Sequence, residues 1–302
     1  MSSLASYVAF ILAFVLQLAL LAQATDLLAG HTGRTGLTAS VFAGVAGYSY
    51  ALATVRLQID PWLAVFLALL SILPVSLFMG YLVLKLDPQG FLIASFAVQV
   101  AFVDLMRNLA FTGGPLGIRD LPAPSLLSRG GSTIGSLLIV IPGVVLATIA
   151  LTRTLGPRSN LGRLYHWIRD DNKSAMAFGV HSQRLLLSAF MVHALIGATA
   201  GIGFVVAQTY VGPNSFDLWL SLNVLAVVFL SGTGGPTWLS LIGASMLVCL
   251  IELVNFAPLS PESVGPIQKM IFNLLLVGIL VFQRKGIGGP VLQAGPSAEM
   301  AE

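Results

Sequence analysis

Side chains able to do acid–base, nucleophilic or metal chemistry are few in this sequence. Its 302 residues include 12 Asp and Glu, 4 His and 1 Cys. His193 is the one titratable side chain well inside an apolar stretch; it could contact a solute or relay protons, although a hydrogen-bonded packing role is favoured. No group of residues has the spacing of metal ligands, and no serine has plausible partners for a catalytic triad. The phosphate-binding pattern G-x-x-x-x-G-K-[ST] does not occur. The sequence therefore predicts no catalytic residue, metal, cofactor or ATP site.

Polar groups that could serve a solute path are also sparse. Asp104 and Arg107 lie three positions apart and can pair on one helix face, and Glu252 lies near another helix end. Asn223 and Asn273 could line a path, with interhelical hydrogen bonding as the simpler alternative. An ion-coupled transporter usually carries a carboxylate or lysine near the middle of the membrane, and none stands there. We therefore expect the energy for transport to come from another chain.

The elements that would hold these side chains are long uncharged helices. Hydrophobic residues make up 56% of the sequence and charged residues 9%, with a mean hydropathy of +0.91, whereas soluble domains carry about 25% charged residues. A helix crosses the bilayer core in about 20 apolar residues. The predicted fold is all-α, a polytopic transmembrane helical bundle of eight or nine spans with glycine-broken or re-entrant helices. The predicted spans are 4–25, 36–55, 62–84, 90–108, 134–152, 185–207, 218–233, 237–256 and 266–283.

The basic residues predict the orientation. Segment 153–184 and the pair Arg284 and Lys285 are the strongest basic flanks, so the positive-inside rule places both in the cytoplasm and makes the C-terminus cytoplasmic. An even number of crossings must then separate them, which requires a break in the uncharged run 218–251, at 231–236. The net charge of +3 reflects this asymmetry and not nucleic-acid binding. The expected organisation is one permease domain over 1–290, with a cytoplasmic loop at 153–184 and a flexible tail at 291–302.

Three glycine-rich breaks, at 30–36, 112–115 and 233–236, interrupt or join the predicted spans. The last two share the residues Thr-Gly-Gly-Pro on opposite sides of the predicted topology; an inverted repeat would explain this, although four small residues match easily. Irregular backbone at membrane depth is tolerated where it lines a cavity, so the breaks predict hinges or a path, with ordinary tight turns as the alternative. Candidate path or hinge residues are Gly30, Thr32, Gly33, His193, Asn223, Gly232 and Gly234, and the predicted external loop motif is Thr112, Gly113, Gly114 and Pro115.

Four stretches carry a resemblance to a known family. They are LLAGHTG at 27–33, RNLAFTGGPLGI at 107–118, IRDDNKSAMAFGV at 168–180 and SLNVLAVVFLSG at 221–232. In this order they resemble the permeases of branched-chain amino acid (LivH/LivM-type) ATP-binding-cassette importers, and the T-G-G-P-x-G-I element is closer to the LivM branch. The chain departs from the family pattern at 33–38 and at two serines, Ser174 and Ser231, which is typical of a divergent member.

The resemblance implies a permease subunit in a bacterial inner membrane, working with two ATPase subunits, a second related permease and a periplasmic or lipoprotein substrate-binding protein. It also implies a cytoplasmic helix near 165–181 that docks on an ATPase subunit. Branched-chain amino acids are the family's substrates, with urea, short amides and aromatic acids in related branches. A self-sufficient channel or secondary transporter for a small neutral solute is the alternative. The implied coupling residues are Arg169, Asp170 and Asp171 as polar contacts, Ala175 and Gly179 for close approach, and Ala177.

Overall fold

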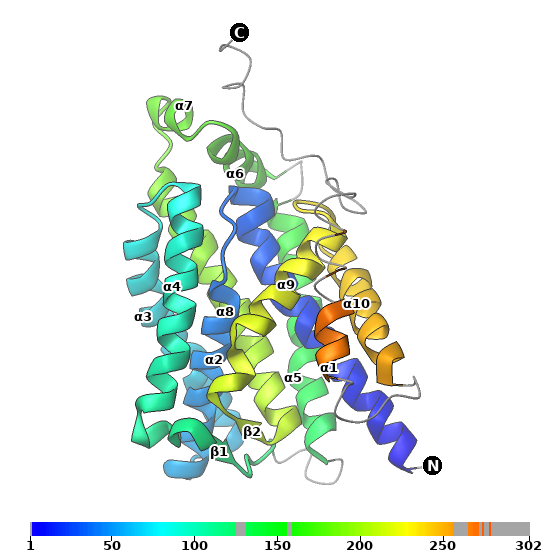
Figure 1. Ribbon diagram of the computed structural model, residues 1–302. Helices are drawn as coiled ribbons and strands as arrows, with labels where there is room; N and C mark the ends of the chain where they lie inside the picture. The colour runs from blue at the N-terminus through cyan, green and yellow to red at the C-terminus, as the bar shows by residue number, and fades with distance from the viewer. Residues whose placement is uncertain are drawn as a thin grey trace.

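The computed structural model describes residues 2–124, 131–155, 159–255, 265–271, 274 and 278, and these form a bundle of helices (Figure 1). The α-helices are α1 (Ser2–Asp26), α2 (Thr38–Ala51), α3 (Pro61–Val83), α4 (Pro88–Asn108), α5 (Gly131–Leu155), α6 (Asn160–Asp170), α7 (Asn172–Ala177), α8 (Ser182–Gln208), α9 (Leu218–Ser231) and α10 (Leu239–Asn255). Short π-helical turns, η1 (Leu27–His31) and η2 (Leu52–Arg56), extend α1 and α2. The 3-10 turns are η3 (Ala110–Thr112), η4 (Gly114–Leu116) and η6 (Pro213–Phe216), and the strands are β1 (Ile118–Arg119) and β2 (Tyr210–Val211). The predicted all-α class is confirmed.

Aspartates set the start of several spans. Asp60 and Asp87 each precede a proline at the first helical position, and their Oδ1 atoms accept the N–H groups of Trp62 (2.9 Å) and Gly90 (3.2 Å). Asp217 caps α9 in the same way. Proline has no N–H to lose at this position and its fixed φ suits the first turn. A capping carboxylate also accepts a hydrogen bond from an N–H that has no partner within the helix. These aspartates are therefore placed at the ends of the spans.

Six helices in the described ranges are long and apolar enough to cross a membrane: Tyr7–His31, Thr38–Arg56, Pro61–Val83, Pro88–Asn108, Ser182–Gln208 and Pro213–Ser231. Two shorter apolar helices, Ile139–Thr154 and Leu239–Asn255, match two further predicted spans. The predicted number of eight or nine is therefore not established. The ninth, 266–283, lies mostly outside the described residues, and the tail 291–302 lies wholly outside them. The predicted break at 231–236 is confirmed, because α9 and α10 form a hairpin around it (Figure 1).

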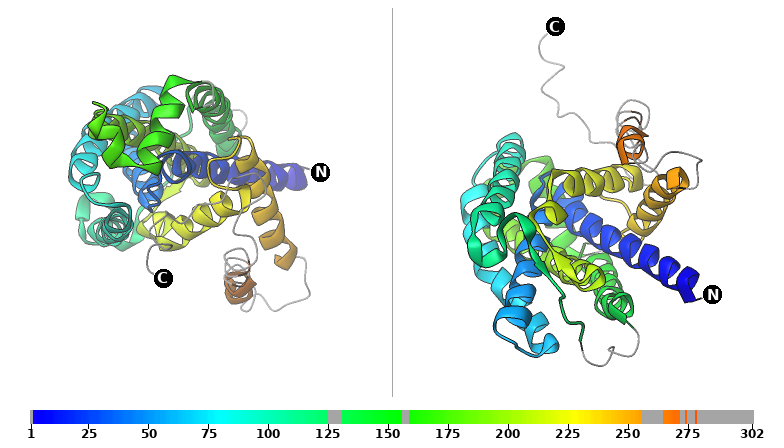
Figure 2. Two further views of the ribbon diagram at one scale, coloured as in Figure 1. Left: turned by 90° about the horizontal axis from the view of Figure 1, so that it is seen from above. Right: turned by 60° about the horizontal axis from the view of Figure 1, so that its bottom comes forward.

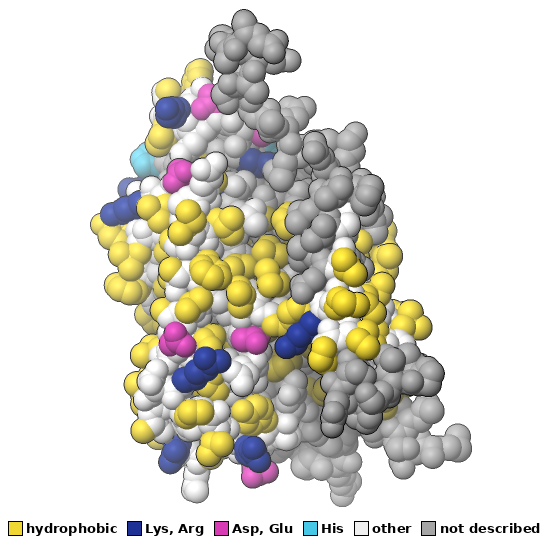
Figure 3. Space-filling view, viewed as in Figure 1, with side chains coloured by type: hydrophobic (Ala, Val, Ile, Leu, Met, Phe, Trp, Pro, Cys, Tyr) yellow, Lys and Arg dark blue, Asp and Glu magenta, His cyan; other side chains and the backbone are white. Residues whose placement is uncertain are grey.

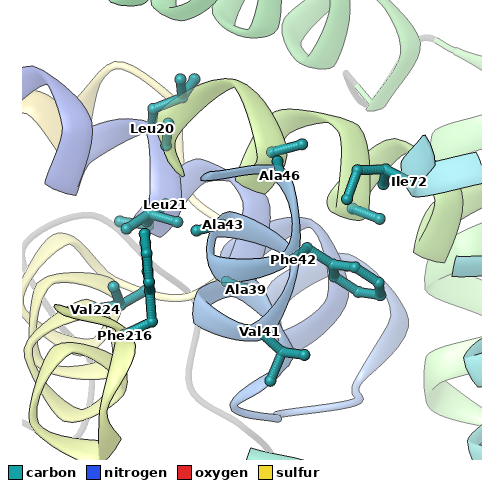
Figure 4. Close-up of a cluster of buried hydrophobic side chains, with 14 of the residues drawn as sticks. Leu20, Leu21, Ala39, Val41, Phe42, Ala43, Ala46, Ile72, Phe216 and Val224 are labelled. Atoms are coloured by element: carbon teal, nitrogen blue, oxygen red, sulfur yellow. The ribbon is translucent and has the colours of Figure 1, made fainter. Parts of the chain in front are cut away.

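Small residues bring α2 and α8 together at the centre of the bundle. A Cβ atom on Gly201 would collide with the backbone of Ala43, and one on Gly197 would lie 3.1 Å from the carbonyl oxygen of Ala39. Figure 4 shows Ala39 and Ala43 along α2, with larger side chains such as Phe42 around them. In a membrane the hydrophobic effect does not drive helices together, because lipid tails are as apolar as the side chains. Close backbone contact of this kind stabilises the helix pair through van der Waals packing.

The outer face of α3 and α4 is apolar. Phe66, Phe78 and Ile93 are 61%, 66% and 70% exposed. In Figure 3, hydrophobic side chains form a broad band between two levels of charged side chains. This is the pattern of a surface that faces lipid tails in the middle and water at both ends.

The two ends of the bundle differ. At one, here the α6 end, α6 lies over the end of α1 and α7 lies beside the start of α8 (Figures 1 and 2). At the other, the β1 end, η3 and η4 precede β1, which pairs antiparallel with β2 in the register Ile118 opposite Val211. The segments 159–184 and 26–34 share an end, and the two Thr-Gly-Gly-Pro turns lie at opposite ends (Figure 1).

Candidate functional site

The predicted coupling segment forms two short helices. The sequence predicts a single helix near 165–181, whereas in the structure α6 and α7 meet at Asp171, whose backbone is extended. Asp171 Oδ1 accepts the N–H groups of Lys173 and Ser174, both at 3.0 Å, and Oδ2 accepts the Ser174 hydroxyl at 2.5 Å. The Ser174 hydrogen bonds hold the pKa of Asp171 below its usual value. The helix divides because a capping aspartate must leave the helical conformation.

The other predicted coupling residues differ in exposure. Ala175 is fully buried, whereas Asp170 and Ala177 are exposed. Gly179 is exposed with φ of +86°, and a Cβ there would meet no atom within 4 Å. A glycine suits this position because the backbone has a positive φ, which other residues adopt only with strain.

Sequence reasoning missed an apolar patch on this segment. Phe178 is 79% exposed and Met176 52%, and the rings of Phe178 and Trp167 lie 5.5 Å apart. Trp167 belongs to α6 and Met176 to α7, and Phe178 follows α7; both helices lie beyond the ends of the spanning helices (Figure 1). Exposed aromatic and methionine side chains gathered outside the spanning helices are typical of protein-contact surfaces.

Arg169 does not face outward with this patch. It lies in the last turn of α6 and its Nη1 donates a hydrogen bond to the Gly30 carbonyl oxygen. Asp26, at the end of α1, accepts the N–H of Gly234 at 2.8 Å and interacts electrostatically with Arg169. We call Asp26, Gly30, Arg169 and Gly234 the Arg169 cluster. It joins the predicted coupling segment to two of the three glycine breaks.

Glycine is required inside the Arg169 cluster by space and by backbone angle. A Cβ on Gly30 would collide with the Gly234 backbone and lie 2.5 Å from Asp26 Oδ1. Gly234 has φ of +72° and Gly33 has φ of +73°, and a Cβ on Gly33 would lie 3.0 Å from Cγ of Arg169. Larger residues would push the segments apart. Asp26 was not predicted as a site residue, because a charge at the end of a span is common.

His193 and Thr32 make local or interhelical bonds. His193 is 1% exposed, with Nδ1 2.7 Å from the Ala24 carbonyl oxygen and Nε2 2.9 Å from Thr38 Oγ1. A carbonyl can only accept, so Nδ1 carries the proton and Nε2 accepts from Thr38. Thr32 Oγ1 donates to the Leu28 carbonyl oxygen at 2.7 Å. Both ring nitrogens of His193 are thus used in holding α1, α2 and α8 together, which favours the packing alternative.

Asn223 lines a cavity and Gly232 ends a helix. The cavity, of about 390 Å³, opens near the β1 end of α9, with Trp219 among its lining residues. Asn223 Nδ2 donates to the Trp219 carbonyl oxygen at 2.8 Å, while its Oδ1 has no partner among the described residues. Gly232 has φ of +90° and closes α9. Asn223 therefore lies at an open space, whereas Gly232 lines one of only about 10 Å³.

The external loop motif forms a tight turn. Thr112 Oγ1 donates to the carbonyl oxygens of Met106 (2.9 Å) and Leu109 (2.7 Å), and Gly113 and Gly114 have φ of +83° and +56°. Pro115 lies in η4. The turn carries the chain from α4 into β1, so its conformation serves the pairing with β2. The predicted pairing of Asp104 with Arg107 is confirmed at 3.6 Å.

Comparison with known proteins places these features in a family. The family model described as "branched-chain amino acid transport system / permease component" matches residues 7–282. The chain is 27% identical over 255 residues to the high-affinity branched-chain amino acid transport system permease protein LivM of Escherichia coli K12 and to LivM of Salmonella typhimurium. Each alignment covers 76% of this chain and 59% of LivM.

A more distant relative is the autoinducer 2 import system permease protein LsrC of Escherichia coli, 27% identical over 187 residues that cover 58% of this chain and 50% of LsrC. The chain thus spans between half and three fifths of the length of these relatives. No solved structure matches it.

Proposed function

The chain belongs to the branched-chain amino acid transport permease family, and from this premise we propose that it is the membrane-spanning permease subunit of an ATP-binding-cassette importer. It is a multi-pass membrane protein with no ATP-binding motif of its own. In this proposal ATP is hydrolysed by two separate ATPase subunits. A second related permease and an external substrate-binding protein complete the complex, which lies in a bacterial inner membrane with the α6 end and the C-terminus cytoplasmic.

The proposal rests above all on the contact between Arg169 and Gly30. An importer must transmit movement from an ATPase subunit outside the bilayer to the helices inside it. The patch of Trp167, Met176 and Phe178 supports docking of that subunit on α6 and α7. Arg169 extends from the same segment into the bundle, so a displacement of α6 acts directly on the glycine break after α1.

In this mechanism the Arg169 cluster holds the α6 end closed. Gly234 is tied to Asp26, and Arg169 holds the Gly30 carbonyl, so α1, α9 and α6 move as one unit while the bonds last. ATP-driven closure of the ATPase pair shifts α6 and α7 together. Gly33 and Gly234 both have a positive φ. Because glycine has no side chain, it adopts this and other backbone angles without strain, so the two breaks can change shape as α6 moves.

The cargo is a branched-chain amino acid or a related small polar solute. LivM is named for branched-chain amino acid transport and LsrC for autoinducer 2 import, so relatives of similar sequence serve different solutes. An external binding protein is a different chain and would select among them.

The test is an uptake and ATPase measurement on the complex reconstituted in proteoliposomes. Arg169→Ala is expected to keep ATPase activity but to lower solute uptake, because α6 no longer holds the Gly30 carbonyl. Arg163→Ala is the matched control on the same helix, since within the described part of the chain its Nη2 bonds the nearby Asn160 Oδ1 at 2.6 Å and does not reach the Arg169 cluster. Uptake by this chain alone, in vesicles without ATP or ATPase subunits, would refute the importer and support a self-sufficient channel. Equal uptake by both variants would remove Arg169 from the mechanism.

A further inference from the structure

An apolar groove opens on the surface of the bundle where α3 and α5 both pack on α8. One wall is the first turns of α3, from Trp62 to Leu69, and the other is a longer stretch of α5. Along α5 the groove runs from Ile139 to Leu151, which is about 18 Å at 1.5 Å per residue. Leu20 of α1, which is fully buried, lies at its floor. The groove has a volume of about 550 Å³ and is separate from the cavity beside Asn223.

The lining of the groove is almost entirely hydrocarbon. Among the described residues that line it, only Trp62 and Thr199 carry a polar side-chain atom. The Thr199 hydroxyl is already used, because it donates to the Leu195 carbonyl oxygen at 2.9 Å. A polar occupant would give up hydrogen bonds to water without gaining new ones, which is costly. At the mouth, Leu146 and Val192 are 67% and 42% exposed, so the groove opens towards the membrane and selects an apolar occupant.

The size of the groove fits one acyl chain and not a helix. A methylene group is about as large as a water molecule, and at about 30 Å³ each the groove holds roughly 18 such groups. That is the length of one fatty acyl chain. A helix about 10 Å across would need roughly 1,400 Å³ over the same length. A helix of another subunit could therefore lie across the groove but could not fill it.

The β1 end of the groove suits the headgroup of a phospholipid. This end is fixed by the Tyr50 hydroxyl at the end of α2, which donates to the Pro122 carbonyl oxygen just after β1. Trp62 lines the groove here, and tryptophan is enriched where lipid tails meet headgroups. Arg56, at the end of η2, is exposed nearby in the chain, and arginine binds phosphate through paired N–H groups. The Asp60 carboxylate between them is occupied in capping α3, where it accepts the Trp62 N–H.

We propose that this groove binds one phospholipid molecule, with an acyl chain between α3 and α5 and the phosphate at the β1 end beside Arg56 and Trp62. Acyl chains elsewhere in the bilayer are equally apolar, so the hydrophobic effect does not hold the lipid in place. The shape of the groove and the headgroup contact do. The bound chain joins α3 to α5 across α8. This inference goes beyond the proposed function and does not rest on it.

The test measures phospholipid binding to the full chain, purified with its partner subunits and washed in lipid-free detergent. Dioleoylphosphatidylglycerol is added in increasing amounts, and native mass spectrometry counts the lipid molecules bound. Ala150→Trp places a large ring in the groove from α5. Ala97→Trp is the matched control, because Ala97 is exposed on α4 and does not line the groove. Arg56→Gln removes the charge at the headgroup.

The wild type and Ala97→Trp are expected to bind one more phospholipid per chain than Ala150→Trp, which should need at least tenfold more lipid to reach the same occupancy. Arg56→Gln should bind severalfold more weakly. Only variants that stay monodisperse in size-exclusion chromatography are compared, and Val65→Trp fills the groove from α3 if Ala150→Trp does not.

Two results would overturn the lipid site. Equal binding by the wild type and by a folded groove-filling variant would show that the groove holds no lipid. Loss of another membrane subunit from the groove-filling variant, but not from Ala97→Trp, would show that protein covers the groove. Arg56→Gln binding that equals the wild type would overturn the placement of the phosphate.

Discussion

The charge of Asp26 gives the sharpest test of the Arg169 cluster. Its Oδ1 accepts the Gly234 N–H at 2.8 Å beside the Arg169 guanidinium. Asp26→Asn keeps an acceptor oxygen but removes the charge, whereas Asp26→Leu removes both. A hydrogen bond to a charged group contributes about 1.5–3 kcal/mol and a neutral one about 0.5–1.5. The asparagine variant should therefore lose about 1–1.5 kcal/mol of closed-state stability and the leucine variant about 1.5–3.

At about 1.4 kcal/mol per factor of ten, these losses shift the closed–open equilibrium about five- to tenfold for Asp26→Asn and about ten- to 150-fold for Asp26→Leu. The assay is the amount of solute imported per ATP hydrolysed by the reconstituted complex. We expect this ratio to fall in the order wild type, Asp26→Asn, Asp26→Leu, while the ATPase rate itself is retained.

A double-mutant cycle with Arg169→Gln isolates the interaction. If Asp26 and Arg169 act through one cluster, Asp26→Asn combined with Arg169→Gln should lose about as much as the worse single variant. If the double variant loses the product of the two single fold-losses in solute imported per ATP, the two residues act independently and the cluster does not link α6 to α1. An Asp26→Asn variant that imports as much per ATP as the wild type would refute this link as well.

Three further predictions concern stability. Gly201→Leu should lower the stability of the detergent-purified protein by about 1–3 kcal/mol, because its side chain meets the α2 backbone. A thermal-aggregation assay measures this, and Gly265→Leu, where no atom of the described residues lies within 4 Å of the added Cβ, should have no effect. In the folded protein the pKa of Asp171 lies below the ordinary 3.8. The stability that its helix cap contributes is therefore complete above pH 3.8 and is lost as the pH falls through the lower folded pKa. Hydrogen exchange at the Ser174 N–H should accordingly show constant protection factors between about pH 8 and 5. His193→Phe should cost about 1–3 kcal/mol by leaving buried partners unpaired, without changing which solute is imported.

Sequence determined the class of this protein and most of its helices. Uncharged runs bounded by aspartates or basic residues give spans within a few residues of those observed, because a charge inside lipid is costly and a helix start favours a carboxylate. The break at 231–236 followed from charge parity and from glycine and proline. Asp170 and Asp171 indicate a helix start in the sequence, and α7 begins there, whereas the separate helix α6 before them was not predicted.

Only the tertiary structure decided which glycines and polar residues meet. Gly30 and Gly234 are about two hundred positions apart, and nothing in either segment states that one packs on the other. Arg169 was predicted to face a partner, yet its guanidinium turns inward to Gly30. His193 is one histidine in a long apolar run of the sequence. Its two hydrogen-bond partners, on α1 and α2, are set only once the helices pack, because hydrogen bonding inside a bundle depends on neighbours that the chain brings together from a distance.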